Sequence, residues 1–554
     1  MKIKTEVNYM IFDKIVFENI KVNKIAFIIS LSAFLCLNMD VNFVFVLSFL
    51  IAVASWSFFV FKDNYLSKIL SNQNIATHII SLLTAAGICW QSQLNFSQYR
   101  RYLNQLLPTD VNFVKLIGVL GSIVALYFVY VLLVIIYAEI IPILKDIFDD
   151  ITKIEFILYG ILILSTIIAM AVIFSKTNAF YGSRYNYDVI YTSDSAAIVK
   201  GNSYLYLNNA ENDIRQPLFM VFAAPFMGIP YIIGKLLGNT LTSQAILMNS
   251  MHILMLYVAN FTLSKIIDLK GVKRICFMIL CSATYMNMLF TLMMEQYIVA
   301  YFWLIIFIYS VYKQKYCKGL PMYAAGGTLL TSMFFLPFVS QNHMIKNFKE
   351  WFKDTFLSGV KFLAAILLLG RFDVIYNLFD SVSHLKNYTG ENIILADKLN
   401  LYTTFVANCF TAQKPEKMKV YYLMDTYIQD MAWRSAVASN ISTIGLIIII
   451  IACISLIINR KKNSIIAGGW ILFSVLMLIV LGWGMVENGL VLYTLYFGWA
   501  FLMLVFQFVE KIEDKFNIKY IVPAATIAGL IYMLSINIPS IMEMVCFAIE
   551  YYPV

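Results

Sequence analysis

The sequence predicts an all-α fold, a polytopic transmembrane helical bundle. It is not the sequence of an ordinary soluble protein. Of the 554 residues, 61% are hydrophobic and only 13% are charged, a composition outside the range of soluble domains. The apolar residues gather in runs of roughly 20, the length of a helix that crosses a bilayer. In lipid, a backbone satisfies its hydrogen bonds only as a helix or a closed barrel. We therefore expect about 13 or 14 helical spans.

Residues 1–150 hold the first predicted spans, which are additional N-terminal helices without a role that their sequence indicates. These helices are expected at 25–39, 41–61, 75–90 and 113–137. Five lysines, from Lys2 to Lys24, come before the first run, and the bias of basic loops toward the cytoplasm places the N-terminus inside. A fifth helix at 153–175 then carries the chain to the outer side.

A long polar segment, residues 176–216, follows this helix and is the predicted first external loop. Loops of such length in compact architectures are commonly functional or disordered. The segment carries Tyr, Ile and Leu throughout, and disordered segments are poor in these residues. We therefore expect an ordered, functional loop.

Residues 151–376 are expected to form the catalytic membrane core. Segment 217–236 contains three prolines and two glycines, so we expect an interrupted stretch that lies in or dips into the outer leaflet. Segment 320–338 holds two glycines and Pro337 and is expected to be a bent pair of half-helices. Straight helices of this part are expected at 243–263, 275–293, 297–312 and 358–376.

The C-terminal part is expected to alternate across the membrane in the same way. A second polar loop, 377–436, lies outside, and residues 437–554 add helices at 438–458, 464–484, 489–509 and 519–537. The short loops predicted to be cytoplasmic then contain Lys265, Lys270, Lys273, Arg274, Lys313, Lys315, Lys318, Arg460, Lys461 and Lys462. The two polar loops share the outer face with the helix tips at Glu295 and Glu487.

Charge and metal-ligand patterns narrow the classes of partner. The formal net charge is +9, but the basic residues are spread over short loops instead of one face, so nucleic acid is not an expected partner. The eight cysteines show no CxxC spacing and the four histidines lie far apart. The sequence therefore predicts no metal site and no cofactor, and it offers no support for a divalent metal.

Two acidic residues of the first external loop stand in patterned surroundings. Asp194 lies in TSDSAAIVKG, where Ser193 or Asp194 can cap the following helical turn. Asp213 directly precedes IRQPLF, where Pro217 opens the next apolar segment, and an acidic residue there also favours the helix dipole. A cap or a dipole contact is the structural alternative to a catalytic role.

These motifs resemble the first external loop of integral-membrane glycosyltransferases of the GT-C fold, which include the protein O-mannosyltransferases and the lipid A aminoarabinose transferases. Asp194 matches the first acidic motif. The second motif matches at Asp213-Ile214-Arg215-Gln216-Pro217-Leu218, where the family often has His-Pro-Pro-Leu. Glu295 in MMEQY stands where the family tends to carry an acidic residue at the next external tip. The resemblance covers about residues 153–376.

The resemblance implies transfer of a sugar from a polyprenyl-phosphate donor to a hydroxyl of a lipid, glycan or protein acceptor. Asp194 would be the base that accepts the hydroxyl proton, and Asp213 and Glu295 would be further catalytic residues that orient the substrates. Candidates for binding the donor phosphate are Arg184, Lys200 and Arg215. Cationic side chains hold phosphate oxygens, although surface or topology charges look the same in a sequence. The expected place is a bacterial cytoplasmic membrane with the site facing outward, which the Ile-, Lys- and Asn-rich usage also favours.

The second external loop leaves two other functions open. Its aromatic residues can stack on sugars and its basic residues can hold phosphate, while an interfacial aromatic belt is the alternative. The residues concerned are His384, Lys386, Tyr388, Lys414, Lys417, Lys419, Tyr421, Tyr422, Asp425, Trp433 and Arg434. A flippase or transporter of lipid-linked sugars would place ionisable residues near the bilayer midplane, and here such residues are sparse. A glycan polymerase or ligase would depend on the basic residues of this second loop.

Overall fold

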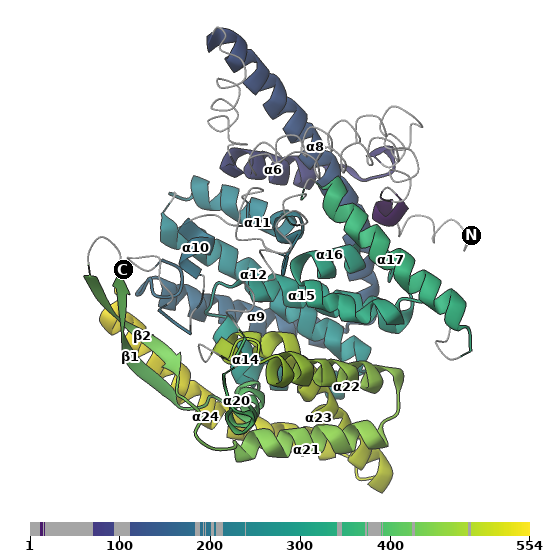
Figure 1. The fold of residues 1–554 in the computed structure, drawn as a ribbon, viewed down its shortest axis with the longest axis vertical. Coiled ribbons are helices and arrows are strands. Elements are labelled where there is room, and N and C mark those ends of the chain that lie inside the picture. The colour runs from purple at the N-terminus through teal and green to yellow at the C-terminus, as the bar shows by residue number, and fades with distance from the viewer. Residues whose placement is uncertain are drawn as a thin grey trace. The chain divides into compact units, whose positions relative to one another are not determined.

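The computed structural model forms two compact units, each discontinuous in sequence. Unit 1 comprises Met1–Asp149, Asn202–Leu237 and Lys313–Ser381, and unit 2 comprises Asp150–Gly201, Gly238–Tyr312 and Val382–Val554. Both are mainly helical (Figure 1). The structure describes residues 11–14, 16, 70–92, 111–182, 189–191, 193, 195–200, 204–205, 214–238, 240–340, 346–369, 371, 374, 389–390, 392–423, 427–485 and 489–554. The helices predicted at 25–39 and 41–61 lie outside these residues.

Unit 2 combines long apolar helices with one antiparallel hairpin (Figure 1). In chain order its elements are α9 (Lys153–Phe174), α10 (Ser195–Lys200), α12 (Leu241–Ile266), α13 (Gly271–Ala283), α14 (Tyr285–Phe290), α15 (Gln296–Lys313), α20 (Leu395–Asn408), β1 (Pro415–Leu423), β2 (Tyr427–Ser435), α21 (Thr443–Ile458), α22 (Lys462–Ser474), η5 (Val475–Val480), η6 (Gly489–Tyr493), α23 (Thr494–Phe516) and α24 (Ile521–Tyr551). Helices α20, α21, α22 and α23 pack against one another, and α9 packs on α12.

Helix α9 begins where the sequence supplies a reciprocal cap. The Glu155 amide donates to the Thr152 hydroxyl at 3.2 Å, and the Glu155 carboxylate accepts from the Thr152 amide at 2.8 Å. This capping box satisfies two amides that the first turn leaves without helical partners. Side chains along the 22-residue helix, such as Ile154 and Phe156, are exposed, as expected for a helix whose surface faces lipid.

Seven helices among the described residues are long and apolar enough to cross a membrane, which makes this a multi-pass membrane protein. These segments are Lys153–Phe174, Phe219–Leu236, Leu241–Ile266, Gln296–Lys313, Lys462–Val480, Gly489–Phe516 and Ile521–Tyr551. Each overlaps a segment identified from its apolar run. Two shorter apolar helices, Ile75–Cys89 and Thr443–Ile458, also coincide with predicted spans.

Among its described residues, unit 1 contains the helical residues 11–14 and six further elements. These are α6 (Ile75–Ser92), α8 (Val111–Ile147), α11 (Phe219–Leu236), α16 (Leu320–Thr328), the 3-10 helix η3 (Leu330–Phe338) and α17 (Phe348–Leu368). The predicted bent pair is confirmed, because α16 and η3 are separated by Leu329, whose backbone is extended at φ −154° and ψ 96°.

Helix α11 differs from its prediction, since residues 219–236 form one helix despite the helix breakers. Pro225 and Pro230 lie inside it, and the Tyr137 hydroxyl donates to the Pro225 carbonyl. This bond attaches α11 to α8 beside Pro225. Gly228 allows α6 to approach, because a Cβ there would lie 2.7 Å from Cγ2 of Thr84.

Two other predictions of secondary structure were wrong. The second external loop contains a hairpin, in which Pro415 of β1 pairs with Ser435 of β2 and Leu423 pairs with Tyr427. Its β-branched and aromatic residues favour strands, and an all-α reading overlooked them. The expected helix at 275–293 is divided into α13 and α14 by Thr284, whose backbone is extended and whose hydroxyl donates to the Cys281 carbonyl at 2.6 Å.

Charged side chains gather at one end of the unit 2 helices. Asp150 accepts hydrogen bonds from the Arg274 guanidinium at 3.0 and 2.9 Å, and Lys265 lies 2.8 Å from the same carboxylate. Lys273 pairs with Glu513 at 3.2 Å. All five residues come from loops and helix ends that the sequence predicts to face the cytoplasm.

Candidate functional site

The first and second external loops meet in unit 2. The Tyr191 amide donates to the Trp433 carbonyl at 2.8 Å, and the Trp433 amide donates to the Val189 carbonyl at 2.8 Å. The side chains meet as well, because Nε1 of Trp433 donates to the Tyr191 hydroxyl at 3.1 Å. That hydroxyl lies 2.7 Å from the hydroxyl of Tyr285, which begins α14. We call Tyr191, Tyr285 and Trp433 the loop junction.

Tyr191 adopts a backbone conformation that residues other than glycine seldom adopt. Its φ is +51°, and its ring is buried. Strain of this kind persists only where the surroundings hold it, and here two backbone and two side-chain hydrogen bonds do so. Burial raises the pKa of Tyr191 above its ordinary value, so its hydroxyl is neutral at physiological pH.

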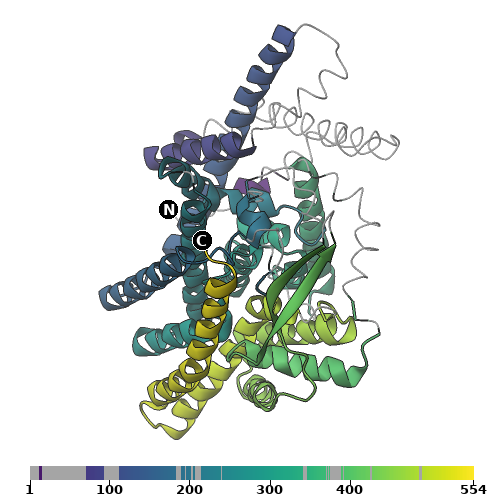
Figure 2. The same ribbon diagram turned by 90° about the vertical axis from the view of Figure 1, so that its left-hand side faces the viewer.

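The C-terminal residues contact the start of the first loop, at Thr177. The Thr177 hydroxyl lies 2.8 Å from the Ala548 carbonyl and 2.6 Å from the Tyr552 carbonyl. The Tyr552 hydroxyl donates to the Met431 carbonyl of β2, and the Trp433 ring packs on Phe547. The hairpin therefore lies beside the C-terminal half of α24 (Figures 1 and 2).

A second set of contacts joins three segments that are predicted to be external. Thr389 of the second loop forms a β-bridge with Trp483, whose Nε1 donates to the Tyr493 hydroxyl at 3.0 Å. The Tyr297 ring packs edge-on against Tyr493 with centroids 5.8 Å apart. Glu295 precedes Tyr297 by two residues and is only 1% exposed. The tip at Glu295, the second loop and the tip at Trp483 thus come together in unit 2.

The structure describes only some of the residues that the sequence singled out. Glu295 is buried in unit 2 directly before α15. Arg215 is exposed in unit 1, and its carbonyl accepts from the Leu330 amide at 2.8 Å. Lys200 is the last residue of α10, and its side chain is not among those described. The residues that lie outside the described part are Asp194, Asp213 and Arg184.

The neighbours of Asp194 lie inside unit 2. Ser193 and Ser195 are both buried, and their hydroxyls are 3.3 Å apart. Tyr191, two residues before Ser193, belongs to the loop junction. The chain on both sides of the predicted base is therefore packed within unit 2.

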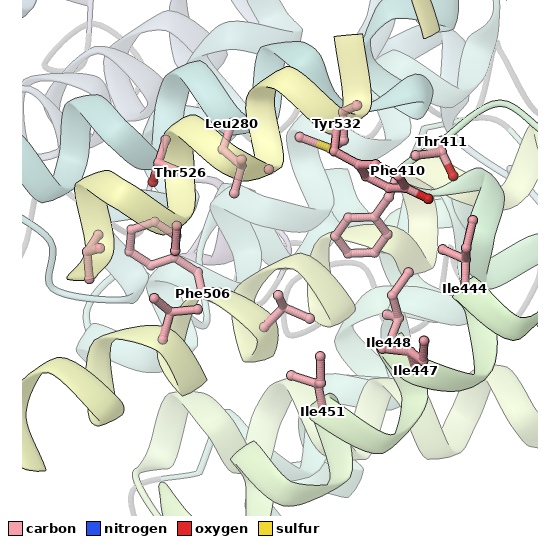
Figure 3. Close-up of a pocket in the computed structure, with 16 residues that line it drawn as sticks. Leu280, Phe410, Thr411, Ile444, Ile447, Ile448, Ile451, Phe506, Thr526 and Tyr532 are labelled. Atoms are coloured by element: carbon pink, nitrogen blue, oxygen red, sulfur yellow. The ribbon is translucent and has the colours of Figure 1, made fainter. Parts of the chain in front are cut away.

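An apolar cavity of about 360 Å³ lies among α13, α21, α23 and α24 (Figure 3). Among its lining residues are Leu280, Phe410, Ile448, Ile451, Phe506 and Thr526. The Phe410 carbonyl accepts from the Tyr285 amide at 2.9 Å, which links the cavity wall to the loop junction. A pocket with an apolar lining suits the hydrocarbon part of a ligand.

One basic residue at the loop junction received no specific role from the sequence. Lys417 of β1 places its ammonium 5.7 Å from the centre of the Trp433 ring and 3.4 Å from the Glu543 carboxylate. It stood among many aromatic and basic residues of the second loop. The signal that could have distinguished it is its strand pairing, because Lys417 lies directly opposite Trp433 in the hairpin.

Within the described part of the chain, no three His, Cys, Asp or Glu side chains are placed so that they could hold a metal ion. No protein-family model, curated protein or solved structure matches the chain. The arguments for its function therefore come from its own residues.

Proposed function

We propose that this protein is a membrane glycosyltransferase, which moves a sugar from a polyprenyl-phosphate donor to a hydroxyl of a lipid, glycan or protein acceptor on the external face. The observation that carries the proposal is the loop junction beside the apolar cavity in unit 2. A lipid-linked sugar has a hydrocarbon chain next to a phosphosugar. A cavity next to polar and aromatic side chains suits both parts of such a donor.

The proposed chemistry needs a base and a cationic site. Asp194 accepts the proton of the acceptor hydroxyl while the oxygen of that hydroxyl bonds to the sugar carbon. The bond from the same carbon to the phosphate oxygen breaks. Glu295 of unit 2 orients the sugar or the acceptor, and the Asp213→Asn variant tests whether Asp213 shares that role. The departing phosphate is stabilised by cations drawn from Arg184 and Lys200.

The test compares sugar transfer in membranes that contain equal amounts of wild type, Asp194→Asn, Asp213→Asn or Asp397→Asn. A radiolabelled lipid extract supplies the donor, and transfer to endogenous acceptors is counted. Asp397 is an exposed acidic residue of α20 in the second external loop, so its variant controls for the loss of one external charge. We expect Asp194→Asn to lower transfer by about 10²-fold or more and Asp397→Asn to leave it unchanged. Normal transfer by both first-loop variants would reject the proposal.

A glycan polymerase or ligase is the second candidate, because Lys417 lies at the loop junction. This second function predicts that Lys417→Gln lowers sugar transfer more than Asp194→Asn does. A flippase would instead move lipid-linked sugar across the bilayer without any transfer, which the same membranes reveal when the label is assayed on each side.

A further inference from the structure

Helix α17 of unit 1 presents an exposed aromatic stripe. Phe348, Phe352 and Phe356 recur every four residues and are 57%, 55% and 63% exposed. Their rings follow one another with centroids 6.1 and 6.2 Å apart. At 3.6 residues per turn the three lie within an arc of about 80°. Val360 and Leu363 continue the exposed apolar side toward the end of the helix.

The opposite side of α17 is fixed to the preceding segment. Nε1 of Trp351 donates to the Pro337 carbonyl at 2.8 Å, and Asp354 accepts from the Ser340 hydroxyl at 2.9 Å. Asp354 also lies 3.6 Å from Lys318. These contacts set the rotation of the helix, so the stripe stays on the outer surface of unit 1.

Basic residues border the stripe. Lys346, Lys349 and Lys353 are exposed. On the helical projection, Lys349 lies about 60° and Lys353 about 100° from Phe352 at the centre of the stripe. Lys353 is 4.0 Å from Glu350, and such an exposed pair contributes little. An apolar stripe with lysines along its edge is the pattern of a helix that lies in a membrane interface.

We propose that the first half of α17 is an interfacial binding site for anionic phospholipids. The phenylalanines enter the region of the acyl chains, and the lysines contact lipid phosphates. Two observations favour a lipid over an acidic protein partner. The stripe continues into the apolar second half of the helix, and the chain already crosses a bilayer that brings lipid to this surface. The site is independent of the proposed transfer reaction.

The experiment uses the full-length protein in nanodiscs of phosphatidylcholine alone or of phosphatidylcholine mixed with phosphatidylglycerol. Hydrogen–deuterium exchange is followed in the peptide that covers residues 346–357. A lysine near an anionic surface strengthens association about five-fold, so we expect exchange to slow by at least about that factor in the anionic discs. Lys349→Gln combined with Lys353→Gln should remove the difference between the two compositions.

The matched control is Lys414→Gln combined with Lys419→Gln, which removes two exposed lysines of unit 2, one directly before β1 and one within it. This variant should keep the dependence of α17 on anionic lipid. Equal exchange in both discs overturns the proposal, and so does a difference that survives in the α17 variant. Protection seen only in native membranes, and absent from both discs, assigns the stripe to a protein partner instead. Unchanged thermal unfolding in detergent verifies that each variant is folded.

Discussion

Arg274 shows how a single buried cation is accommodated. Its guanidinium is 1% exposed and donates to the Leu269 carbonyl at 2.9 and 2.7 Å, in addition to its two bonds with Asp150. Glu155 lies 3.6 Å from the same group. A buried charge is tolerated when its donors are satisfied, and removing one partner leaves a cost larger than the pair itself contributes.

Asp150→Asn is expected to destabilise the protein by about 1–3 kcal/mol at neutral pH, because Arg274 and Lys265 lose their shared anion. Partial burial opposes ionisation of Asp150, but the hydrogen bonds from Arg274 and Lys265 outweigh it and lower its pKa from 3.8 to about 2. The carboxylate therefore stabilises the fold above about pH 4, and this contribution is lost as the pH falls toward 2. Thermal unfolding in detergent measures both effects.

The control for this variant is Asp146→Asn, which breaks an exposed pair with Lys315 and should change the midpoint little. An Asp150→Asn protein that unfolds at the wild-type temperature at neutral pH would show that the Arg274 network contributes no stability.

Tyr191→Phe is expected to cost about 1–3 kcal/mol, since it removes the hydroxyl that serves both Trp433 and Tyr285 in a buried place. Sugar transfer should fall with it. Tyr520→Phe is the matched comparison, because Tyr520 also has a positive φ but is 74% exposed. Denaturation monitored by near-ultraviolet circular dichroism distinguishes them, and equal stability of the two variants would contradict the role of the loop junction.

At the scale of elements, close helix packing depends on single glycines. A Cβ at Gly445 of α21 would lie 1.9 Å from the Thr403 carbonyl oxygen of α20. Gly445→Ala must therefore move one backbone away from the other, at a cost of about 1–3 kcal/mol. Gly160→Ala on α9 meets no atom within 4 Å and should be neutral or stabilising, because alanine favours a helix over glycine. Paired melting curves in detergent test the contrast, and similar midpoints would contradict it.

Much of the element order could be predicted from hydropathy, and the exceptions have physical causes. The apolar runs at 153–175, 243–263 and 297–312 correspond to α9, α12 and α15. Thr284 interrupts the apolar run at 275–293 with an extended backbone, and no proline or glycine in that run indicates the break. In 217–236 the error is the reverse, since α11 continues through two prolines.

At the scale of the whole molecule, the predicted alternation of loops can be tested by labelling. Lys414→Cys should react with a membrane-impermeant maleimide in intact cells, because the second loop is expected outside. Lys461→Cys should react only after the membrane is opened. Both lysines are exposed, and the wild type provides the background from native cysteines. Labelling of both variants in intact cells would refute the proposed topology.

The candidate site was predictable only in outline. The predicted alternation of spans put the two polar loops on one face, and Tyr191 and Trp433 of these loops do meet. The partners themselves could not be predicted, because Tyr191 depends on a positive φ and Trp433 on the register of a hairpin. Whether Asp194 accepts a proton remains a prediction for the transfer assay.

The contacts of Thr177 with Ala548 and Tyr552 also bear on the order of assembly. A ribosome makes the chain from its N-terminus, and parts of a protein begin to fold while synthesis continues. Thr177, at the start of the first external loop, is synthesised early, yet its partners are made more than 350 residues later. A half-made chain therefore carries this loop without the contacts that anchor it. The loop can acquire its final form only after α24 has entered the membrane.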